Sequence, residues 1–445
     1  MRFDVIIRNG LVVRESGVEK LDLAIADEKI AELAPQISGD ARETIDAAGL
    51  HVFPGVIDPH VHFNEPGRTE WEGIATGSAA LAAGGGTLFF DMPLNSSPPV
   101  LDGRSFDLKL AAMKEKSLTD FALWGGLTPD NLGHLEELAE RGVVGFKAFM
   151  CDSGIEDFPA SDDYTLYRGM QIASKLGLVI AVHAENDAMT GGLAVDARAR
   201  GAIAPQDYVL SRPVIAELEA IRRAVELAYA TRCQLHIVHV SSEEGSWAAH
   251  SACNGGQISY ETCPHYFTLT EDDLYRIGPT AKCAPPLRTE RDVEHLRFVL
   301  STGELTFVAS DHSPAPPSIK KDKDFFKVWG GIAGVQSTLQ SLLSIEPALP
   351  LPSVANYVAT AVTRRFGIAS KGALAKGLDA DLALVDLWDY FELTRDMLLD
   401  RHKLSPYVGR TFRGKVVRTI VRGHTVFLDG KVVSKPIGRF VRPAS

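Results

Sequence analysis

Hydrophobic and polar positions alternate in short β-type runs at both ends of the chain. The N-terminal runs are Val5–Ile7, Leu11–Val13 and Leu21–Ile25, with turn signals at Asn9-Gly10 and Ser16-Gly17. The C-terminal runs are Asp381–Val385, Val416–Val421 and Val426–Leu428, with a hairpin signal at Asp429-Gly430. Runs of this kind, punctuated by Gly, Asn and Asp, predict strands. We therefore expect one small β-sandwich domain built from residues 1–52 and 375–445.

The middle of the chain alternates short apolar runs with longer helix-like stretches, such as Tyr164–Leu176 and Pro213–Tyr229. Eight of the runs have the length and composition of buried strands: Val52–Ile57, Thr87–Asp91, Phe121–Gly125, Val143–Phe149, Leu178–His183, Gln234–Val240, Gln257–Glu261 and Leu305–Ser310. Repeated strand and helix units predict a parallel sheet. Eight such units predict an α/β protein whose main domain, residues 53–374, is a (β/α)8 TIM-like barrel.

Metal-ligating residue types lie where four of these strands end. The first strand leads into His60 and His62, and alternate residues of an extended chain point the same way. His183 ends the fifth strand, His239 follows from the sixth and Asp311 from the eighth. The C-terminal ends of barrel strands share one open face, where barrels carry their chemistry. Imidazoles and a carboxylate gathered there suit zinc and other first-row divalent metals.

Each of these residues alone also fits a plainer explanation, a polar side chain that hydrogen-bonds at a strand end. We interpret the set as a metal site because packing does not readily supply five such residues from four strands. His236 lies three residues before His239 and is expected to face the other side, as a structural residue. For His312, which directly follows Asp311, a supporting role beside the ligands stays open.

Lys147 lies inside the apolar fourth strand. A buried ammonium is costly, and a desolvated lysine tends to lose its proton and become a nucleophile. Its reaction with carbon dioxide would give a carbamate, an anionic group that can bridge two metals. The alternatives are an ion pair with Asp311 or Asp152, or a side chain that extends to the mouth. Two metals about 3.5–4 Å apart can share a water and polarise a carbonyl, which predicts hydrolysis with Asp311 as proton carrier.

Composition and charge narrow the class of protein. Hydrophobic residues make up 45% and charged residues 23% of the 445 positions, which is ordinary for a globular protein. A net charge of −11 without a basic block argues against nucleic acid and anionic membranes as partners. No apolar run reaches the roughly 18 residues of a membrane span, and Arg8 and Asn9 interrupt any secretion signal. The five scattered cysteines favour reduced thiols. We expect a cytoplasmic protein.

At these residues the sequence resembles the amidohydrolase superfamily, and within it the cyclic amidohydrolases, which include dihydroorotases, hydantoinases or dihydropyrimidinases, and allantoinases. The motifs that carry the resemblance are Pro54–His62, before the first loop, and Gly377–Leu382, at the return to the sandwich. The resemblance implies that Lys147 is an N6-carboxylysine and that Asp311 is the catalytic residue. It also implies that one metal is held by His60, His62, Lys147 and Asp311, and the other by Lys147, His183 and His239.

The stretches Phe63–Gly73 and Asp91–Ser96 resemble those of allantoinases, whereas dihydroorotases carry arginine where Asn64 stands. Further matches are Glu261–Tyr266, Lys282–Arg288 and Trp329–Gly334. The resemblance thus implies hydrolysis of the hydantoin ring of allantoin to allantoate, a step of purine and allantoin degradation. A neutral, amide-rich substrate calls for amide and backbone groups. The candidates are Asn64, Asn95, Cys283, Ser313 and Gly331; for each, a purely structural role in a turn or an apolar gap stays open.

The resemblance implies two divalent metal ions per subunit, with zinc expected first and cobalt, manganese, nickel and iron also compatible. Carboxylation of Lys147 requires carbon dioxide. Allantoin is the expected small-molecule partner, and the resemblance implies a homotetramer or homodimer. Two alternatives stay open. One is a hydantoinase or dihydropyrimidinase that acts on another cyclic amide. The other is a non-catalytic scaffold relative, against which the complete ligand set counts.

Overall fold

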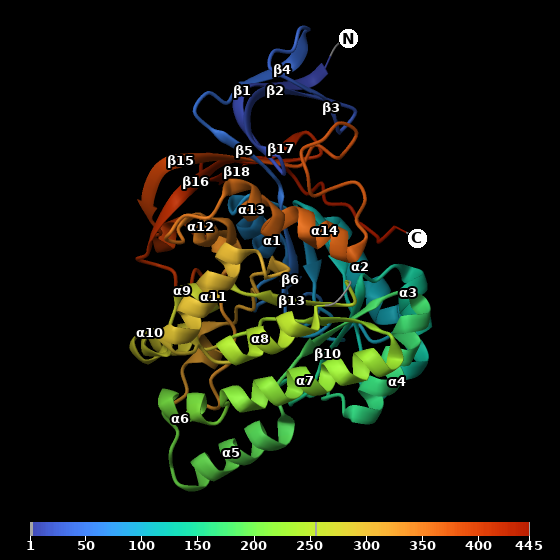
Figure 1. Ribbon diagram of the computed structural model, residues 1–445, viewed down its shortest axis with the longest axis vertical. Helices are drawn as coiled ribbons and strands as arrows, with labels where there is room; N and C mark the ends of the chain where they lie inside the picture. Colours follow the sequence, from blue (N-terminus) through green and yellow to red (C-terminus); the bar gives the residue numbers. More distant parts are fainter. Residues whose placement is uncertain (1–2, 254–255, 445) are drawn as a thin grey trace.

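The computed structural model describes residues 3–253 and 256–444. It confirms the predicted architecture: a barrel of parallel strands ringed by helices, with a sheet from both chain ends stacked on it (Figure 1). The barrel strands are β6 (Val56–Val61), β7 (Gly86–Asp91), β8 (Asp120–Leu123), β9 (Gly125–Gly126), β10 (Gly145–Phe149), β11 (Val179–His183), β12 (Gln234–Ile237), β13 (Ile258–Thr262) and β14 (Phe307–Val308). Strands β8 and β9 together occupy the third position.

Parallel pairing runs from β6 to β8 and from β9 to β14. Two further contacts close the barrel. Val61 forms a parallel bridge with His312, and the His62 N–H donates to the His312 carbonyl at 2.8 Å. The Val144 N–H donates to the Leu123 carbonyl at 3.0 Å. Since Val144 directly precedes β10, this bond joins β8 to β10. All eight strand ends therefore face one mouth.

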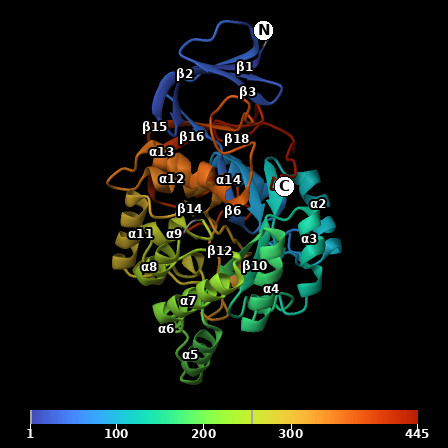
Figure 2. The same ribbon diagram turned by 45° about the vertical axis from the view of Figure 1, so that its right-hand side comes forward.

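Helices lie around the barrel, between it and the terminal sheet, and beyond its lower end in the view (Figure 2). They are α1 (Ile74–Ala83), α2 (Gly103–Lys116), α3 (Leu135–Arg141), α4 (Asp163–Leu176), α5 (Asp187–Ala199), α6 (Pro205–Leu210), α7 (Val214–Thr231), α8 (Glu243–Ala252), α9 (Pro264–Thr268), α10 (Glu271–Ile277), α11 (Glu290–Thr302), α12 (Thr338–Leu343), α13 (Leu351–Ala355) and α14 (Ala361–Phe366). Helix α7 buries Ala220, Ala224 and Ala228, one turn apart, which makes a smooth face for the barrel. Pro213, the predicted first residue of this helix, is its N-cap, so the helix begins one position later, at Val214.

The strands of the terminal sheet are β1 (Phe3–Arg14), β2 (Gly17–Ala26), β3 (Lys29–Ala34), β4 (Ala41–Asp46), β5 (His51–Pro54), β15 (Leu382–Glu392), β16 (Thr411–Val421), β17 (His424–Leu428) and β18 (Lys431–Val432). Strand β5 joins the two chain ends because it pairs with β1 on one side and β15 on the other. The core beneath these strands likewise combines residues of both ends, among them Val12, Leu23, Leu382 and Ile420.

Two sequence-based predictions differ from the structure. Val52–Ile57 is divided between two sheets: residues 51–54 belong to the terminal sheet and β6 starts at Val56. A side chain at Gly55 would lie 2.2 Å from Thr87, so glycine lets the chain turn close to β7. Asn9-Gly10 lies inside one long strand, where the pairing with β2 shifts register between Ile7 and Gly10, so the pair marks a bulge and not a turn.

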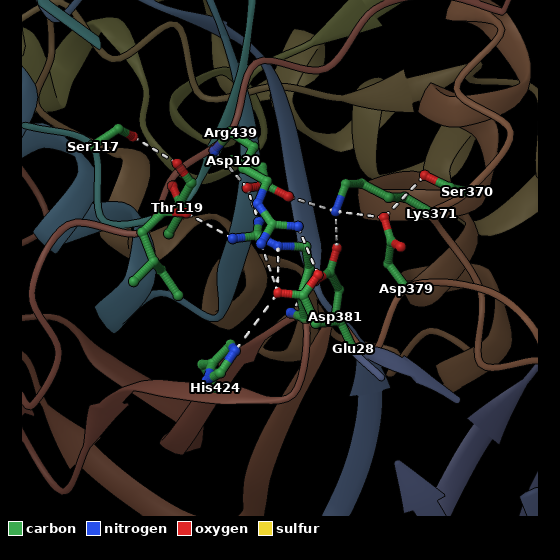
Figure 3. Close-up of polar contacts among 12 residues, drawn as sticks. Glu28, Ser117, Thr119, Asp120, Ser370, Lys371, Asp379, Asp381, His424 and Arg439 are labelled. Carbon is green, nitrogen blue, oxygen red and sulfur yellow. Dashed lines mark hydrogen bonds and ion pairs between the residues drawn. The ribbon is translucent and has the colours of Figure 1, made fainter. Parts of the chain in front are cut away.

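A buried ion cluster joins the terminal sheet to the barrel at the N-terminal end of β8 (Figure 3). The Lys371 Nζ lies 2.7 Å from Asp120, 3.0 Å from Asp379 and 2.5 Å from Asp381. Arg422 pairs with the other Asp120 oxygen. We call these five residues the Lys371 cluster. It lies at the end of the barrel opposite to the strand ends that carry the predicted site.

Replacing Lys371 with Met is expected to destabilise the protein by about 3–5 kcal/mol, because Asp381 would lose its ion pair, while Asp120 would keep only Arg422 and Asp379 only the partly exposed Lys29. Lys29→Met is the matched control. Lys29 also contacts Asp379, at 2.5 Å, but its side chain is 45% exposed, so its removal should cost no more than about 1 kcal/mol. Urea unfolding followed by circular dichroism measures both changes. Equal losses in the two variants would contradict the role given to the Lys371 cluster.

The C-terminal segment also packs against the barrel. The Phe121 N–H donates to the Arg439 carbonyl at 3.0 Å, and the Val441 N–H donates to the Phe121 carbonyl at 2.8 Å. Residues 439–441 therefore run beside β8.

All five cysteines are free thiols, and four of them are buried. Within residues 3–253 and 256–444, we find no helix with both the length and the apolar character needed to cross a membrane.

Candidate active site

The structure brings the six predicted metal-binding residues together at the mouth of the barrel. Asp311 Oδ1 lies 3.2 Å from His60 Nε2 and 3.3 Å from His62 Nε2. His183 Nδ1 lies 3.0 Å from His239 Nε2. The group of His60, His62 and Asp311 lies beside the pair of His183 and His239, because the ring centroids of His60 and His239 are 5.5 Å apart. They come from β6, β11 and the segments after β12 and β14, as the strand pattern predicts.

Lys147, on β10, projects beside these histidines. Its Nζ lies 5.1 Å from the ring centroid of Phe149, which stacks on His183. The amine is fully buried and has no hydrogen-bond partner among the residues that the structure describes. The ion pair with Asp311 or Asp152 that the sequence left open is therefore not formed. Burial lowers the pKa of Lys147 to about 8, although the charges of Asp311 and Glu261 raise it. A neutral, nucleophilic amine is accessible near physiological pH.

The donor set fits divalent metal ions. His60, His62 and Asp311 each offer one ligand atom, and these atoms lie within 4.8 Å of one another. Burial, together with the charge of Lys147, holds the pKa of His60 well below its usual range, and burial lowers that of His183 and His239 too. Neutral imidazole is the form that binds metals. The buried Lys147 amine beside these residues has no hydrogen-bond partner in the described part of the chain.

Two residues of the set have strained backbones. His239 has φ of 41° and Asp311 has φ of 45°, in the left-handed region that residues other than glycine rarely adopt. Asp58 helps to hold this geometry, since one carboxylate oxygen accepts from the N–H groups of His60, at 3.2 Å, and Ser310, at 3.1 Å. Strained positions of this kind concentrate at functional sites.

Sequence reasoning missed two buried glutamates behind the histidines. Glu261 Oε1 lies 2.5 Å from His60 Nδ1, and Glu261 Oε2 lies 3.0 Å from His236 Nε2. Glu185 Oε2 lies 2.7 Å from His183 Nε2 and pairs with Arg212. His236, expected to be purely structural, is thus linked to a proposed ligand. The sequence does offer a signal for both: Glu185 follows His183 by two residues, and Glu261 ends the seventh predicted strand.

The two glutamates lie in different electrostatic surroundings. Burial would raise the pKa of Glu185, but the charge of Arg212 and the hydrogen bond from His183 outweigh it and bring the pKa to about 2. Burial raises the pKa of Glu261 well above its usual range, and the charge of Lys147 only partly opposes this. Arg212 therefore stabilises the charge of Glu185 directly, whereas the groups in direct contact with the Glu261 side chain are the rings of His60 and His236.

Cys151, His183 and Glu185 form a second compact group of ligand types, with one atom of each within 4.8 Å of the others. Burial raises the pKa of the Cys151 thiol to about 12, so the thiolate that metals require is disfavoured. The guanidinium of Arg212 already pairs with Glu185. We therefore interpret this group as a hydrogen-bonded support and not as a metal site.

The candidate substrate residues gather around one loop. The Asn95 side-chain amide donates to Ser313 Oγ at 3.4 Å, and a side chain at Gly331 would lie 2.1 Å from the Ser313 carbonyl. The Asn64 amide donates to the neighbouring Pro314 carbonyl at 3.4 Å, while its Oδ1 has no partner among the described residues. The buried Cys283 adjoins this loop, since the Gly331 N–H donates to the carbonyl of Lys282. Asn64 and Asn95 have φ of 64° and 66°, which asparagine tolerates.

Two more histidines lie near the mouth. His312 Nδ1 accepts from the backbone N–H of Gly334 at 3.2 Å and of Val335 at 3.4 Å, so His312 supports that loop. His265 is 1% exposed, and neither ring nitrogen has a hydrogen-bond partner in the described part of the chain. Burial lowers the pKa of His265 to about 4, and the charge of Asp311 opposes this. The sequence marked His265 only as part of a matching motif.

Comparisons with known proteins agree with this geometry. The model of the Amidohydrolase family matches residues 51–426. A protein named allantoinase from Rubrobacter xylanophilus is 54% identical over 99% of this chain and 98% of its own length. The allantoinase of Deinococcus radiodurans is 49% identical, with both chains fully covered. The solved L-hydantoinase (dihydropyrimidinase) of Arthrobacter aurescens has a TM-score of 0.96 and 34% identity, over 99% of this chain and all of that one. The chain therefore belongs to the amidohydrolase family.

Proposed function

We propose that this protein hydrolyses the hydantoin ring of allantoin to allantoate, in the degradation of allantoin. The observation that carries the proposal is full-length identity of 41–54% to relatives named allantoinase. Solved hydantoinases and dihydropyrimidinases have 25–34% identity over the same length. The amide-lined loop around Asn64 and Asn95 supports a neutral substrate, because no arginine stands at position 64 to bind a carboxylate.

We expect two divalent metal ions, zinc in the first place, at the barrel mouth. His60, His62 and Asp311 would hold one ion, His183 and His239 would hold the other, and Lys147, as a carbamate formed with carbon dioxide, would contribute to both. The neutral imidazoles and the unpartnered lysine amine support this assignment. When bound, the metals would lower the pKa of the attacking water and polarise the amide carbonyl.

Asp311 is the proposed proton carrier. Its carboxylate lies at the mouth, its side chain is 13% exposed, and it contacts both His60 and His62. It can accept a proton from the attacking water and deliver it to the ring nitrogen as the C–N bond breaks.

Initial rates on allantoin, hydantoin, dihydrouracil and dihydroorotate test the proposal, measured on one preparation of known metal content. We expect allantoin to have the highest kcat/KM and a chelator to abolish turnover. A preference for hydantoin or dihydrouracil would instead favour a hydantoinase or dihydropyrimidinase with the same site. Metal-loaded protein that hydrolyses no cyclic amide would overturn the proposed activity.

His265 is expected to contact the substrate, since both of its buried ring nitrogens are free to bond with an amide. His265→Phe keeps a ring in place and removes both polar atoms. We expect it to lower kcat/KM for allantoin by about 3–30-fold, the loss of one or two hydrogen bonds. The control is His295→Phe on α11, which also has an unpartnered ring nitrogen but lies outside the mouth. If both variants behave alike in steady-state kinetics, His265 has no such contact.

We also expect a homotetramer or homodimer. A groove between α7 and α8 is lined by Leu218, Val225 and Trp247 together with charges of both signs, Arg222 and Glu226. Trp247 is 48% exposed, although such a side chain is normally buried. Apolar surface with mixed charge supports contact with a second copy. Light scattering should give two or four times the mass of one chain, and a single-chain mass would contradict the expectation.

A further inference from the structure

Two of the four histidines at the mouth are fixed from behind by a buried glutamate. His60 presents Nε2 to Asp311 and has Nδ1 2.5 Å from Glu261. His183 presents Nδ1 to His239 and has Nε2 2.7 Å from Glu185. In each ring, one nitrogen faces the proposed metal position and the other contacts a carboxyl group. The two rings are therefore held with opposite nitrogens toward the mouth.

The other two histidines lack such support. His62 Nδ1 and His239 Nδ1 are buried and have no hydrogen-bond partner in residues 3–253 and 256–444. Each proposed metal position thus combines one supported histidine with one unsupported histidine: His60 with His62, and His183 with His239. This pairing assigns one glutamate to each position.

Each glutamate is itself held by residues that do not reach the metal positions. The Arg212 guanidinium forms an ion pair with Glu185. The Arg212 backbone carbonyl accepts a hydrogen bond from the Arg288 side chain. His236 contacts Glu261 at 3.0 Å and Ser259 Oγ at 2.9 Å. Glu185, Glu261 and His236 are at most 1% exposed. Among the described residues, no side-chain hydrogen bond or ion pair joins Glu185 or Arg212 to Glu261 or His236.

We propose that Glu185 and Glu261 are positioning residues that act on different metal positions: Glu185 through His183, and Glu261 through His60. The inference rests on the ligand set proposed above, but not on the identity of the substrate. A carboxylate that accepts a ring N–H fixes the orientation and tautomer of a metal-binding histidine. Loss of such a partner typically weakens metal binding by about 10–100-fold. Here each loss is confined to one position.

The test compares metal binding by Glu185→Gln, Glu261→Gln and the double variant. Gln keeps the size of the side chain but offers a weaker, uncharged partner. Glu217→Gln is the control, because Glu217 is equally buried, lies 3.8 Å from Arg288 and bonds to Ser241 and Ser242 without touching the four histidines. Zinc content is measured per chain while a competing chelator is titrated, and circular dichroism monitors folding.

We expect each single variant to lose one of two zinc ions at about 10–100-fold lower chelator concentration than the wild type, and to keep the other. The double variant should lose both, and Glu217→Gln should match the wild type. With cobalt in place of zinc, the ion retained by Glu185→Gln and the ion retained by Glu261→Gln should give different visible spectra. A role in folding alone would produce no such difference.

Unchanged affinity at both positions in both variants would overturn the proposal. So would equal loss of both ions in each single variant, which would mean general damage to the site. If Glu185→Gln does not fold, Arg212→Lys serves instead, because it keeps the glutamate and a positive charge while changing the geometry of their pair. It should show the same loss at one position only. If the wild-type protein binds fewer than two ions, the proposed ligand set is wrong. Turnover of allantoin is measured in a separate experiment.

Discussion

Asp311→Asn should lower kcat on allantoin by about 10²–10⁴-fold while most of the metal stays bound. Asparagine keeps the shape of the side chain and tolerates the φ of 45° that position 311 requires. It retains an oxygen that can face His60 and His62, but it cannot accept and return a proton. Steady-state kinetics and zinc content, measured on the same sample, separate the two effects.

Asp187→Asn is the matched control for this experiment. Asp187 lies in the first turn of α5 and accepts from the Asp152 N–H at 2.8 Å, and it makes no contact with the six clustered residues in the described structure. Its replacement should leave kcat nearly unchanged. A D311N protein with wild-type kcat would show that another group carries the proton. Loss of all metal together with activity would show that Asp311 serves mainly as a ligand.

Lys147→Ala should have the larger effect, because it removes the group proposed to join both metal positions. We expect metal content to fall and kcat to drop by about 10⁴-fold or more, since proton transfer and charge stabilisation, worth roughly 10²–10⁴ and 10²–10³, would fail together. A short carboxylic acid such as acetate or propionate should restore part of both, by filling the vacated space with two oxygens. Metal analysis and rates with and without the acid measure this.

Lys109→Met tests whether any buried lysine behaves in this way. Lys109 is buried as well, with 1% exposed, but its amine pairs with Asp91 at 2.7 Å and donates to the Met92 carbonyl at 2.7 Å, so unlike Lys147 it already has partners. The variant should lose stability, and its folded fraction should keep its metal and gain nothing from added acid. Full metal content and activity in Lys147→Ala would contradict the bridging role. Rescue of Lys109→Met by acid would show that the effect is not specific to position 147.

The strand pattern predicts the barrel well because the barrel strands are buried on both faces, except at Gln234 and Phe149. Such strands appear as short apolar runs, and His60, His183 and Asp311 stand out as polar residues where these runs end. Periodicity could not show how the first run divides at Gly55. The reason lies in a close approach to Thr87, a contact between segments that the local sequence does not contain.

The support behind the ligands was harder to predict. Glu185 and Glu261 are ordinary acidic residues in the sequence, and their role depends on which ring nitrogen each histidine presents. His236 was judged from its spacing to His239, which gives the direction of a side chain but not its partner. His265 was missed for a related reason: its distinguishing feature is the lack of a partner after folding, among the described residues.

The contact between the C-terminal segment and β8 has a consequence for how the protein is made. Asp120 accepts a hydrogen bond from the backbone N–H of Arg439, 319 positions later in the chain. On a translating ribosome, most of the barrel therefore emerges long before residues 439–441 can cover the edge of β8. Until residues 439–441 have been made, the edge of β8 at Asp120 and Phe121 lacks these hydrogen-bond partners.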